Sequence, residues 1–364
     1  MLKLPTRRRG LSLGPSLGVA LVLAAVLAAL ARHPGWLASV GSALGALWRG
    51  SLGSWYALSS ATLVRAIPLA LTGTAVAVAF KAGVFNIGAE GQLLAGAAAA
   101  AAVALALPGG GAAPIALALG AGALGGALWA GVAALLRRRF GVLEVISTIM
   151  LNFVALYAVS WLVRGPLQEP THAYPQSPAI ADAMHLPRIP GAGRLHVGLL
   201  LALVVVLATG WALRHAAAGF RVLAVGENPA AAASAGLIDV PATAARAFLL
   251  SGALAGLAGA IEVLGVTFAL YEDISPGYGY TAIAVALLAR LDPWWVLGSA
   301  LLFAALEAGA GAMQRDAGVP STVVTIVEAL LILAVLGAQA ARARAERAAP
   351  PEPAAPDAAL PSTP

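Results

Sequence analysis

Between two long apolar runs, residues 80–96 read Phe80-Lys-Ala-Gly-Val-Phe-Asn-Ile-Gly-Ala-Glu-Gly-Gln-Leu-Leu-Ala-Gly96. This stretch holds four glycines and the polar side chains of Lys81, Asn86, Glu90 and Gln92. Polar groups are costly inside a membrane, and glycine weakens a helix. We therefore expect these residues to have a structural or functional purpose.

The composition around this stretch indicates the class of protein. Hydrophobic residues make up 60% of the 364 residues, charged residues make up 10%, and the mean hydropathy is +0.87. A soluble domain has about 25% charged residues. Several apolar windows exceed the roughly 20 residues that cross a bilayer core. The sequence therefore predicts an all-α, polytopic membrane protein, because a closed barrel would show alternating segments of about ten residues.

About ten apolar segments are expected to cross the membrane. We read the first as a retained span rather than a cleaved signal peptide, and the short eighth segment as tilted, broken or re-entrant. The segments are 11–31, 57–80, 84–107, 112–136, 143–163, 196–213, 244–270, 277–291, 294–313 and 319–339. Residues 32–56 carry Trp and Tyr side chains, which favour the membrane–water interface.

The positive charges predict the orientation. With ten crossings, fifteen of the 22 Lys and Arg residues fall on the side of the N-terminus and six on the opposite side, while Arg65 lies within a span. This bias predicts that both termini are cytoplasmic. The clustering of charges at the ends of apolar runs also argues against a nucleic-acid partner, despite the net charge of +6.

The expected organisation is a transmembrane domain over residues 1–340 and a disordered cytoplasmic tail over 341–364. Within the domain, residues 164–195 form a proline-rich external loop and residues 214–243 form the largest cytoplasmic loop. Gly-x-x-x-Gly patterns at Gly122–Gly126 and Gly252–Gly256 are expected to serve close helix packing rather than a site.

Motifs for covalent chemistry are absent from the sequence. It contains no Gly-Lys-[Ser/Thr], no Gly-x-Ser-x-Gly and no cysteine, and its five histidines lack the spacing of metal ligands. We therefore expect no ATP site in this chain, no catalytic residues, no cofactor and no metal.

The cytoplasmic loop contains the pattern of one short capped helix. Asn228 suits the N-cap, Pro229 the first helical position, and Gly236 the position after the last turn. Small residues, including Ala232, fill the helix between them. Such a helix could dock a cytoplasmic partner, or it could be an ordinary loop helix.

Polar groups inside apolar runs are the remaining signal. Asn86 and Glu90 lie one helical turn apart and are expected to share a face, whereas Gln92 points elsewhere. Buried ionisable groups at membrane depth often line a polar path. Further examples are Arg65, Glu144, Asn152, Glu262, Glu307 and Glu328.

Four stretches together resemble a known family. They are Phe85–Gln92, Glu144–Asn152, Ala224–Pro229 and Gly279–Ala286. In this order they resemble the ABC importer permeases of the simple-sugar and nucleoside class, which includes branched-chain amino acid, ribose and nucleoside systems, and the chain is most similar to the nucleoside branch. The resemblance spans residues 57–339. The chain departs from the family pattern in the turn Leu288–Asp292, which puts the local geometry there in question.

The resemblance implies an ATP-driven import system in a bacterial cytoplasmic membrane. It implies a cytoplasmic ATP-binding subunit, a second permease subunit, identical or paralogous, and an external substrate-binding lipoprotein. The implied coupling residues are Glu227, Asn228, Pro229, Ala232 and Gly236, and the candidate path or gate residues are Asn86, Glu90 and Gln92. Nucleosides are the expected substrate; ribose or another simple sugar is the alternative, and an ion-coupled secondary carrier is a more distant one.

Overall fold

The computed structural model describes residues 36–107, 109–330, 333–334 and 337. Over these ranges the chain is helical and has no strand beyond two isolated bridges. The predicted all-α class is therefore confirmed. The predicted first span, 11–31, and the predicted disordered tail, 341–364, lie outside the described residues.

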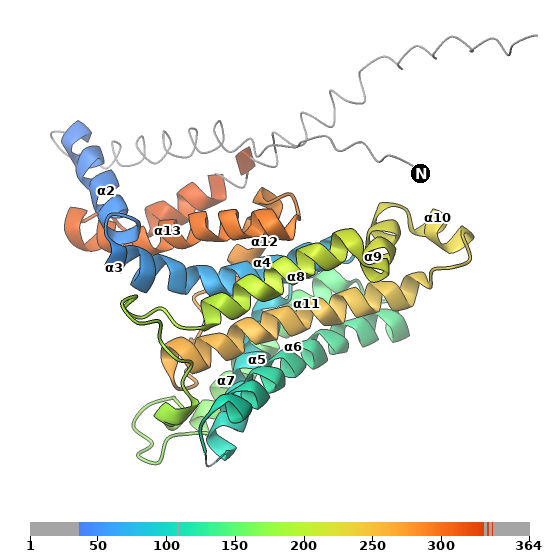
Figure 1. Ribbon diagram of the computed structural model, residues 1–364, viewed down its shortest axis with the longest axis horizontal. Coiled ribbons are helices and arrows are strands. Elements are labelled where there is room, and N and C mark those ends of the chain that lie inside the picture. The colour runs from blue at the N-terminus through green and yellow to red at the C-terminus, as the bar shows by residue number, and fades with distance from the viewer. Residues whose placement is uncertain (1–35, 108, 331–332, 335–336, 338–364) are drawn as a thin grey trace, which may run out of the picture.

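Long helices form the body of the molecule (Figure 1). The α-helices are α2 (Trp36–Ser51), α3 (Trp55–Ala57), α4 (Leu63–Lys81), α5 (Ala89–Ala106), α6 (Ala112–Phe140), α7 (Glu144–Arg164), α8 (Gly198–His215), α9 (Ala217–Glu227), α10 (Pro229–Ser234), α11 (Val240–Glu262), α12 (Tyr278–Leu288) and α13 (Pro293–Ala317). Short π-helical turns η1 (Leu58–Thr62) and η3 (Val263–Thr267) adjoin α4 and α11, and a 3-10 turn η2 (Asp182–Met184) lies in the loop before α8.

Seven helical stretches of the described chain are long and apolar enough to cross a bilayer. They correspond to seven of the ten predicted segments, those beginning at 57, 84, 112, 143, 196, 244 and 294. The segment 319–339 is helical at 322–330, within its described part. The count of ten spans stays a prediction.

The segment 277–291 is broken rather than a full helix. Its helix α12 has 11 residues and is about 16 Å long, half of a bilayer core. The chain nevertheless connects the two ends of the bundle, because Phe268 accepts a hydrogen bond from the loop residue Ile180 and Asp292 pairs with Arg214 at the end of α8. The irregular stretch 268–277 supplies the rest of the distance.

The turn after α12 has an unusual backbone. Arg290 and Leu291 both adopt left-handed conformations, with φ of 54° and 60°. The Leu291 N–H donates to the Ala286 carbonyl at 2.8 Å, which closes the turn, and Asp292 then caps α13 by accepting from the Trp294 N–H at 3.1 Å. The departure from the family pattern at 288–292 thus coincides with a strained turn.

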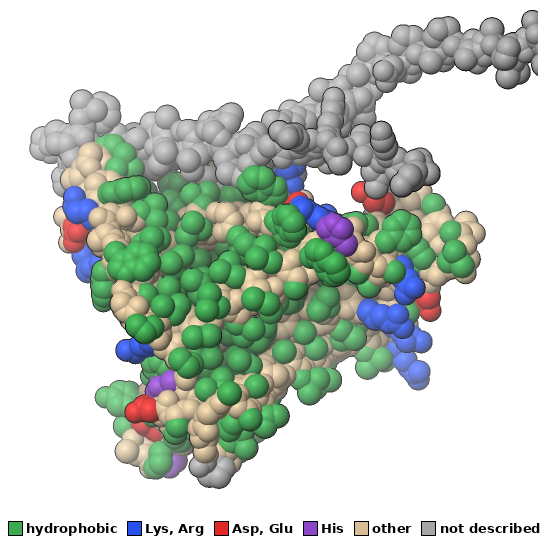
Figure 2. Space-filling model, in the orientation of Figure 1, with side chains coloured by type: hydrophobic (Ala, Val, Ile, Leu, Met, Phe, Trp, Pro, Cys, Tyr) green, Lys and Arg blue, Asp and Glu red, His purple; other side chains and the backbone are tan. Residues whose placement is uncertain are grey.

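The bundle has two chemically different ends (Figures 1 and 2). One, which we call the loop end, carries the irregular loop 165–197; the other, the α10 end, carries α9, α10 and the basic residues Arg137–Arg139. Hydrophobic side chains cover the face between them, and Lys and Arg side chains cluster at the α10 end (Figure 2). The cytoplasmic location of the α10 end remains a prediction from the positive charges.

Glycines hold the centre of the bundle together, as the Gly-x-x-x-Gly patterns predicted. A methyl group on Gly252 would lie 2.5 Å from the carbonyl oxygen of Gly126, and one on Gly126 would lie 2.6 Å from the α-carbon of Gly256. Gly96 of α5 packs on Gly256 as well. Because no side chain fits between them, α5, α6 and α11 pack backbone against backbone.

The described part of the aromatic segment 32–56 packs on the bundle. Its described part forms the 16-residue helix α2, which packs on α13, where Gly309 adjoins Leu47. Trp48, Trp55 and Tyr56 remain exposed, and the Trp55 indole donates to the Gly191 carbonyl at the loop end. Small residues such as Ala43 and Ala46, three positions apart, form the buried face of α2. This helical spacing of small residues is the sequence pattern that indicates a packed helix here.

Candidate functional site

The chain between α4 and α5 runs through the interior of the bundle. Helix α4 ends at Lys81, Gly83 takes a left-handed conformation with φ of 72°, and residues 84–88 are not helical. Helix α5 therefore begins at Ala89, five residues later than predicted. The Asn86 side chain explains the delay, because its Oδ1 accepts from the Gly88 N–H at 2.9 Å and competes with helix formation.

Asn86 and Gln92 form a fully buried hydrogen-bond network. The Asn86 amide nitrogen donates to Gln92 and to the Ser251 hydroxyl of α11, each at 2.8 Å. The Gln92 amide nitrogen donates back to Asn86 at 3.0 Å, and Ser251 donates to the Ala75 carbonyl of α4 at 2.6 Å. The network therefore joins α4, α5 and α11 around the broken stretch.

Asn152 of α7 holds the same stretch from its other side. Its Oδ1 accepts from the Gly91 N–H and its amide nitrogen donates to the Ile87 carbonyl, both at 2.9 Å. Asn152 is 2% exposed and lies about 12 Å along α7 from its first residue, Glu144. Asn152 thus satisfies two backbone groups beside the missing helical turn, the Gly91 N–H and the Ile87 carbonyl, which lipid could not do.

Glu90 points toward the other broken span. Its carboxylate accepts from the Gly279 N–H at 2.6 Å, in the first turn of α12. The Ser275 hydroxyl accepts from the N–H groups of Gly277 and Tyr278, at 3.2 Å each. A carboxylate at a helix N-terminus is favoured by the unpaired N–H groups and by the helix dipole. Glu90 therefore ties the start of α5 to the start of α12.

The predictions that Asn86 and Glu90 share a helical face and that Gln92 points elsewhere are wrong. Asn86 precedes α5, so it and Glu90 are not one helical turn apart, and Asn86 pairs with Gln92 instead. All three predicted path residues do lie in one region, which we call the polar cluster: Asn86, Glu90, Gln92, Asn152 and Ser251. Each is at most 6% exposed, and each is hydrogen-bonded within the protein.

The predicted capped helix is present at the α10 end. Asn228 Oδ1 accepts from the Ala231 N–H at 3.0 Å, Pro229 is the first residue of α10, and Gly236 has φ of 69°. Ala232 is buried at 6% exposed, while Glu227, Asn228 and Pro229 are exposed. The capping prediction is confirmed, whereas the preceding helix α9 was not predicted.

Helix α9 connects α10 to the spans. Gly226 packs directly on the Lys81 carbonyl oxygen and lies beside Gly83, so the turn after α4 touches the last turn of α9. Beyond α10, Leu237 is 87% exposed, and Phe220 near the start of α9 is 67% exposed. Large apolar side chains at a polar end of the bundle are suited to bind another protein.

Polar contacts at the end of α7 and in the loop hold the loop end together. Arg164 donates to the Glu272 carboxylate at 2.6 Å, as does the Ser160 hydroxyl, and these bonds hold the pKa of Glu272 below its usual value. His196 is fully buried, and burial lowers its pKa to about 4, helped by Arg188 and Arg194. Within the described ranges, no group of His, Asp and Glu side chains could hold a metal ion.

Comparisons with known proteins agree with this architecture. The glucose ABC transporter permease protein TsgB13 of Haloferax volcanii is 39% identical over 82% of this chain and 80% of its own length. The guanosine ABC transporter permease protein NupP of Bacillus subtilis is 38% identical over 84% and 88%, and the nucleoside ABC transporter permease protein NupB of Lactococcus lactis is 31% identical over 73% and 75%. No solved structure matches the chain.

The family model described as branched-chain amino acid transport system / permease component matches residues 58–336. These residues include all of the described spans except the first three residues of the first one, Trp55–Ala57, and the whole of α9 and α10. The resemblance inferred from the sequence motifs is therefore confirmed. The chain belongs to this family of permease components and is a multi-pass membrane subunit of an ABC import system.

Proposed function

We propose that this subunit imports nucleosides across a bacterial cytoplasmic membrane, driven by ATP hydrolysis on a separate subunit. Two observations support the proposal. The first is the similarity to permeases named for guanosine and nucleosides, which covers most of this chain and of each relative. The second is the direct contact between α9 and the turn after α4. The first supports the substrate class, and the second supports a route for coupling.

The coupling role falls to α10 and its flanks. Glu227, Asn228 and Pro229 are exposed and available to a cytoplasmic ATP-binding subunit, while buried Ala232 fixes α10 on the rest of the loop. Movement of α10 would be transmitted through Gly226 to Lys81 and onward to the polar cluster. Gly236 ends the helix in a conformation that few other residues adopt.

The polar cluster acts in this proposal as a joint between the two broken spans. Glu90 links α5 to α12, and Asn86 and Gln92 link α5 to α11. Because their hydrogen bonds are satisfied within the protein, we assign Asn86, Glu90 and Gln92 to the shape of the gate rather than to direct substrate contact.

The complete system requires partners. We propose a second permease subunit, identical or paralogous, beside this one, an ATP-binding subunit on the cytoplasmic side, and a substrate-binding lipoprotein at the loop end. The α10 end and both termini would then be cytoplasmic, in agreement with Arg137–Arg139 and Arg214 at that end.

Transport by reconstituted vesicles tests the proposal. The permease pair, the ATP-binding subunit and the binding protein are incorporated together, and uptake of radiolabelled guanosine is measured with and without ATP. We expect uptake only with ATP and with every component present. Guanosine uptake by this chain alone, without ATP, would contradict the proposal.

A simple sugar is the second candidate, because a relative at 39% identity is named for glucose. The same vesicles distinguish the two substrates when glucose and guanosine are supplied in separate assays with the cognate binding protein. Uptake of glucose with no uptake of guanosine would replace the first candidate with the second. The family assignment gives no support to an ion-coupled carrier.

A further inference from the structure

Helix α6 presents a stripe of exposed leucine side chains along its length. Only 22% of its most apolar window is buried inside the protein, the smallest share among the seven described spans. Its exposed leucines follow one another at intervals of seven, four and seven residues, which places them on one face of the helix. They are Leu117, Leu124, Leu128 and Leu135, each at least 58% exposed. We call this face the leucine stripe.

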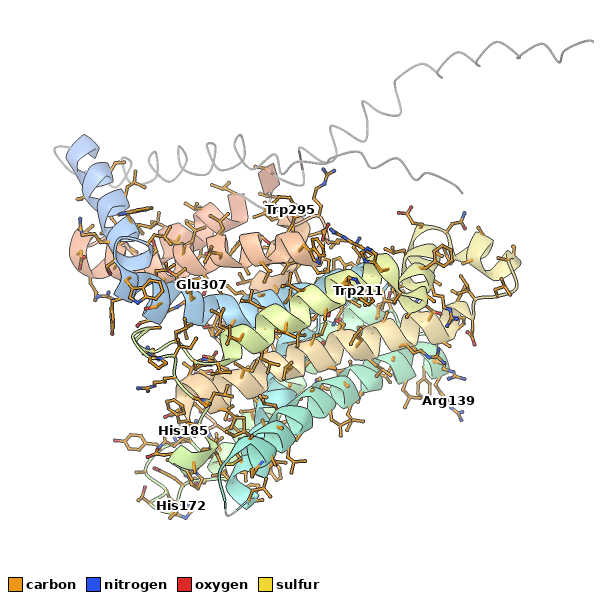
Figure 3. All side chains as sticks on the ribbon, in the orientation of Figure 1. Arg139, His172, His185, Trp211, Trp295 and Glu307 are labelled. Atoms are coloured by element: carbon orange, nitrogen blue, oxygen red, sulfur yellow. The ribbon has the colours of Figure 1, made fainter. Side chains whose placement is uncertain are left out.

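The leucine stripe continues into two arginines in the last turn of α6. Arg138 and Arg139 follow Leu135 by three and four residues, so they lie on the same face. Both are exposed, and Figure 3 shows Arg139 at the end of α6, directed away from the bundle. Arg138 lies about 32 Å along the helix axis from Leu117. When the leucines fill a hydrocarbon layer of about 30 Å, the arginines therefore reach the level of the lipid headgroups.

Helix α11 adds a third arginine beside them. A methyl group on Gly131 of α6 would lie 3.4 Å from the Leu249 side chain of α11, so these two residues are at the same level. Arg246 is exposed and lies three residues from Leu249 toward the α10 end, and Arg138 lies seven residues from Gly131 in that direction. The two arginines therefore differ in level by about 6 Å along the helix axes. We call Arg138, Arg139 and Arg246 the basic edge.

The basic edge has no salt-bridge partner in the described part of the chain. The neighbouring Arg137 pairs with Glu144 of α7 at 3.1 Å, but none of the four ion pairs found there includes a residue of the basic edge. Phe140 and Leu143, at the turn into α7, are 70% and 66% exposed next to these arginines. Unpaired cations beside large apolar side chains are typical of surfaces that lie at a membrane interface.

We propose that the basic edge binds the phosphate group of an anionic phospholipid whose acyl chains lie along the leucine stripe. Guanidinium groups match phosphate oxygens with paired hydrogen bonds. Phosphatidylglycerol carries a net negative charge that complements the three arginines, whereas the choline group of phosphatidylcholine cancels the charge of its phosphate. The inference goes beyond the proposed function, because it concerns the membrane and not the solute.

The position of the basic edge favours a lipid over the ATP-binding subunit. Helix α6 packs on α5, α7 and α11, while α10, which we assign to coupling, packs on α9 and α11. The basic edge continues the leucine stripe, so a molecule bound along both contacts apolar side chains first and charged side chains at one end. A phospholipid offers these two chemistries in the same order along the helix axis.

Lipid-specific fluorescence quenching at single sites tests the proposal. The sequence contains no cysteine, so Leu135→Cys and Leu117→Cys each provide one site for a bimane label on the leucine stripe. The two positions are matched, because each lies five residues from an end of α6 and they are 60% and 61% exposed. The labelled full-length protein is placed in vesicles of phosphatidylcholine and phosphatidylglycerol in which one lipid or the other carries brominated chains. Quenching at increasing fractions of the brominated lipid gives the binding of phosphatidylglycerol relative to phosphatidylcholine at each site.

One arginine near an anionic membrane strengthens the attraction about fivefold. We therefore expect phosphatidylglycerol to be preferred at least fivefold at residue 135 and not at residue 117. Arg138→Gln together with Arg139→Gln should remove the preference, whereas Arg138→Lys with Arg139→Lys should retain most of it, which separates charge from a folding defect. The control, Arg194→Gln with Arg315→Gln, makes the same change of charge at exposed sites in the loop and at the end of α13, and it should leave the preference unchanged.

Three results would overturn the inference. The first is an equal preference at residues 135 and 117, or a preference that survives in the glutamine variant. The second is no quenching at residue 135 by either lipid, which would show that a protein surface such as a second permease subunit covers the stripe. The third is loss of the preference when the ATP-binding subunit is added, which would assign the basic edge to that subunit. Failure of the proposed function leaves these measurements unaffected, because they use neither solute nor ATP.

Discussion

The polar cluster makes a quantitative prediction about stability. Asn86→Ala removes four hydrogen bonds, two donated by the Asn86 amide, one from Gln92 and one from the Gly88 N–H. Ser251 keeps its bond to Ala75, whereas the Gln92 amide loses both of its contacts. Hydrogen bonds between side chains in membrane helices contribute about 0.6 kcal/mol each on average. We therefore expect a loss of roughly 2–3 kcal/mol.

The assay is thermal unfolding of the purified protein in detergent, followed by tryptophan fluorescence. The control is Thr209→Ala on α8, which removes one hydrogen bond, from the Thr209 hydroxyl to the Val205 carbonyl of the same helix at 2.7 Å. Asn86→Ala should unfold several degrees below both the control and the wild type. If Asn86→Ala and Thr209→Ala unfold at the same temperature, the cluster does not hold the broken span together.

Substitutions at four other positions test separate parts of the account. Gly226→Val places a side chain against the Lys81 carbonyl, whose carbon lies 2.8 Å from the first added atom. Transport should therefore fall while ATP hydrolysis continues. Normal transport by this variant would show that the contact between α9 and the turn after α4 has no role in coupling. Gly236→Pro cannot adopt the native φ of 69°, and we expect this variant to insert into the membrane but to hydrolyse ATP without transport. A bulky residue in place of buried Ala232 should have the same effect. Normal transport by both variants would show that the coupling assignment is wrong. His196 has a folded pKa of about 4, below its ordinary 6.5, so the unfolded state binds more protons between these values. The wild type should lose about 3 kcal/mol as the pH falls from 6.5 to 4, and His196→Asn should lose less in unfolding experiments across that range.

Local chemistry in the sequence predicted much of the fold. The long apolar runs predicted seven described spans, and the residues Asn228, Pro229 and Gly236 predicted α10 with its caps. Both signals act over a few neighbouring residues, so they can be read without knowledge of distant contacts.

Long-range contacts account for the errors. Hydropathy placed the start of the third segment at residue 84, but Asn86 turns inward and delays α5 to Ala89. Its partner Ser251 lies 165 residues away and is one serine among many small residues, so no local signal identifies it. Asn152 was visible as a polar residue in an apolar run, although its contacts with Ile87 and Gly91 were not.

The position of the coupling surface is the central claim, and site-specific labelling tests it most directly. The sequence contains no cysteine, so Ala230→Cys on exposed α10 and Tyr174→Cys in the exposed loop each provide a single label site. Maleimide labelling is measured with and without the ATP-binding subunit. We predict that this subunit protects residue 230 and leaves residue 174 unchanged; equal labelling of residue 230 in both conditions, or protection of residue 174, would contradict the account.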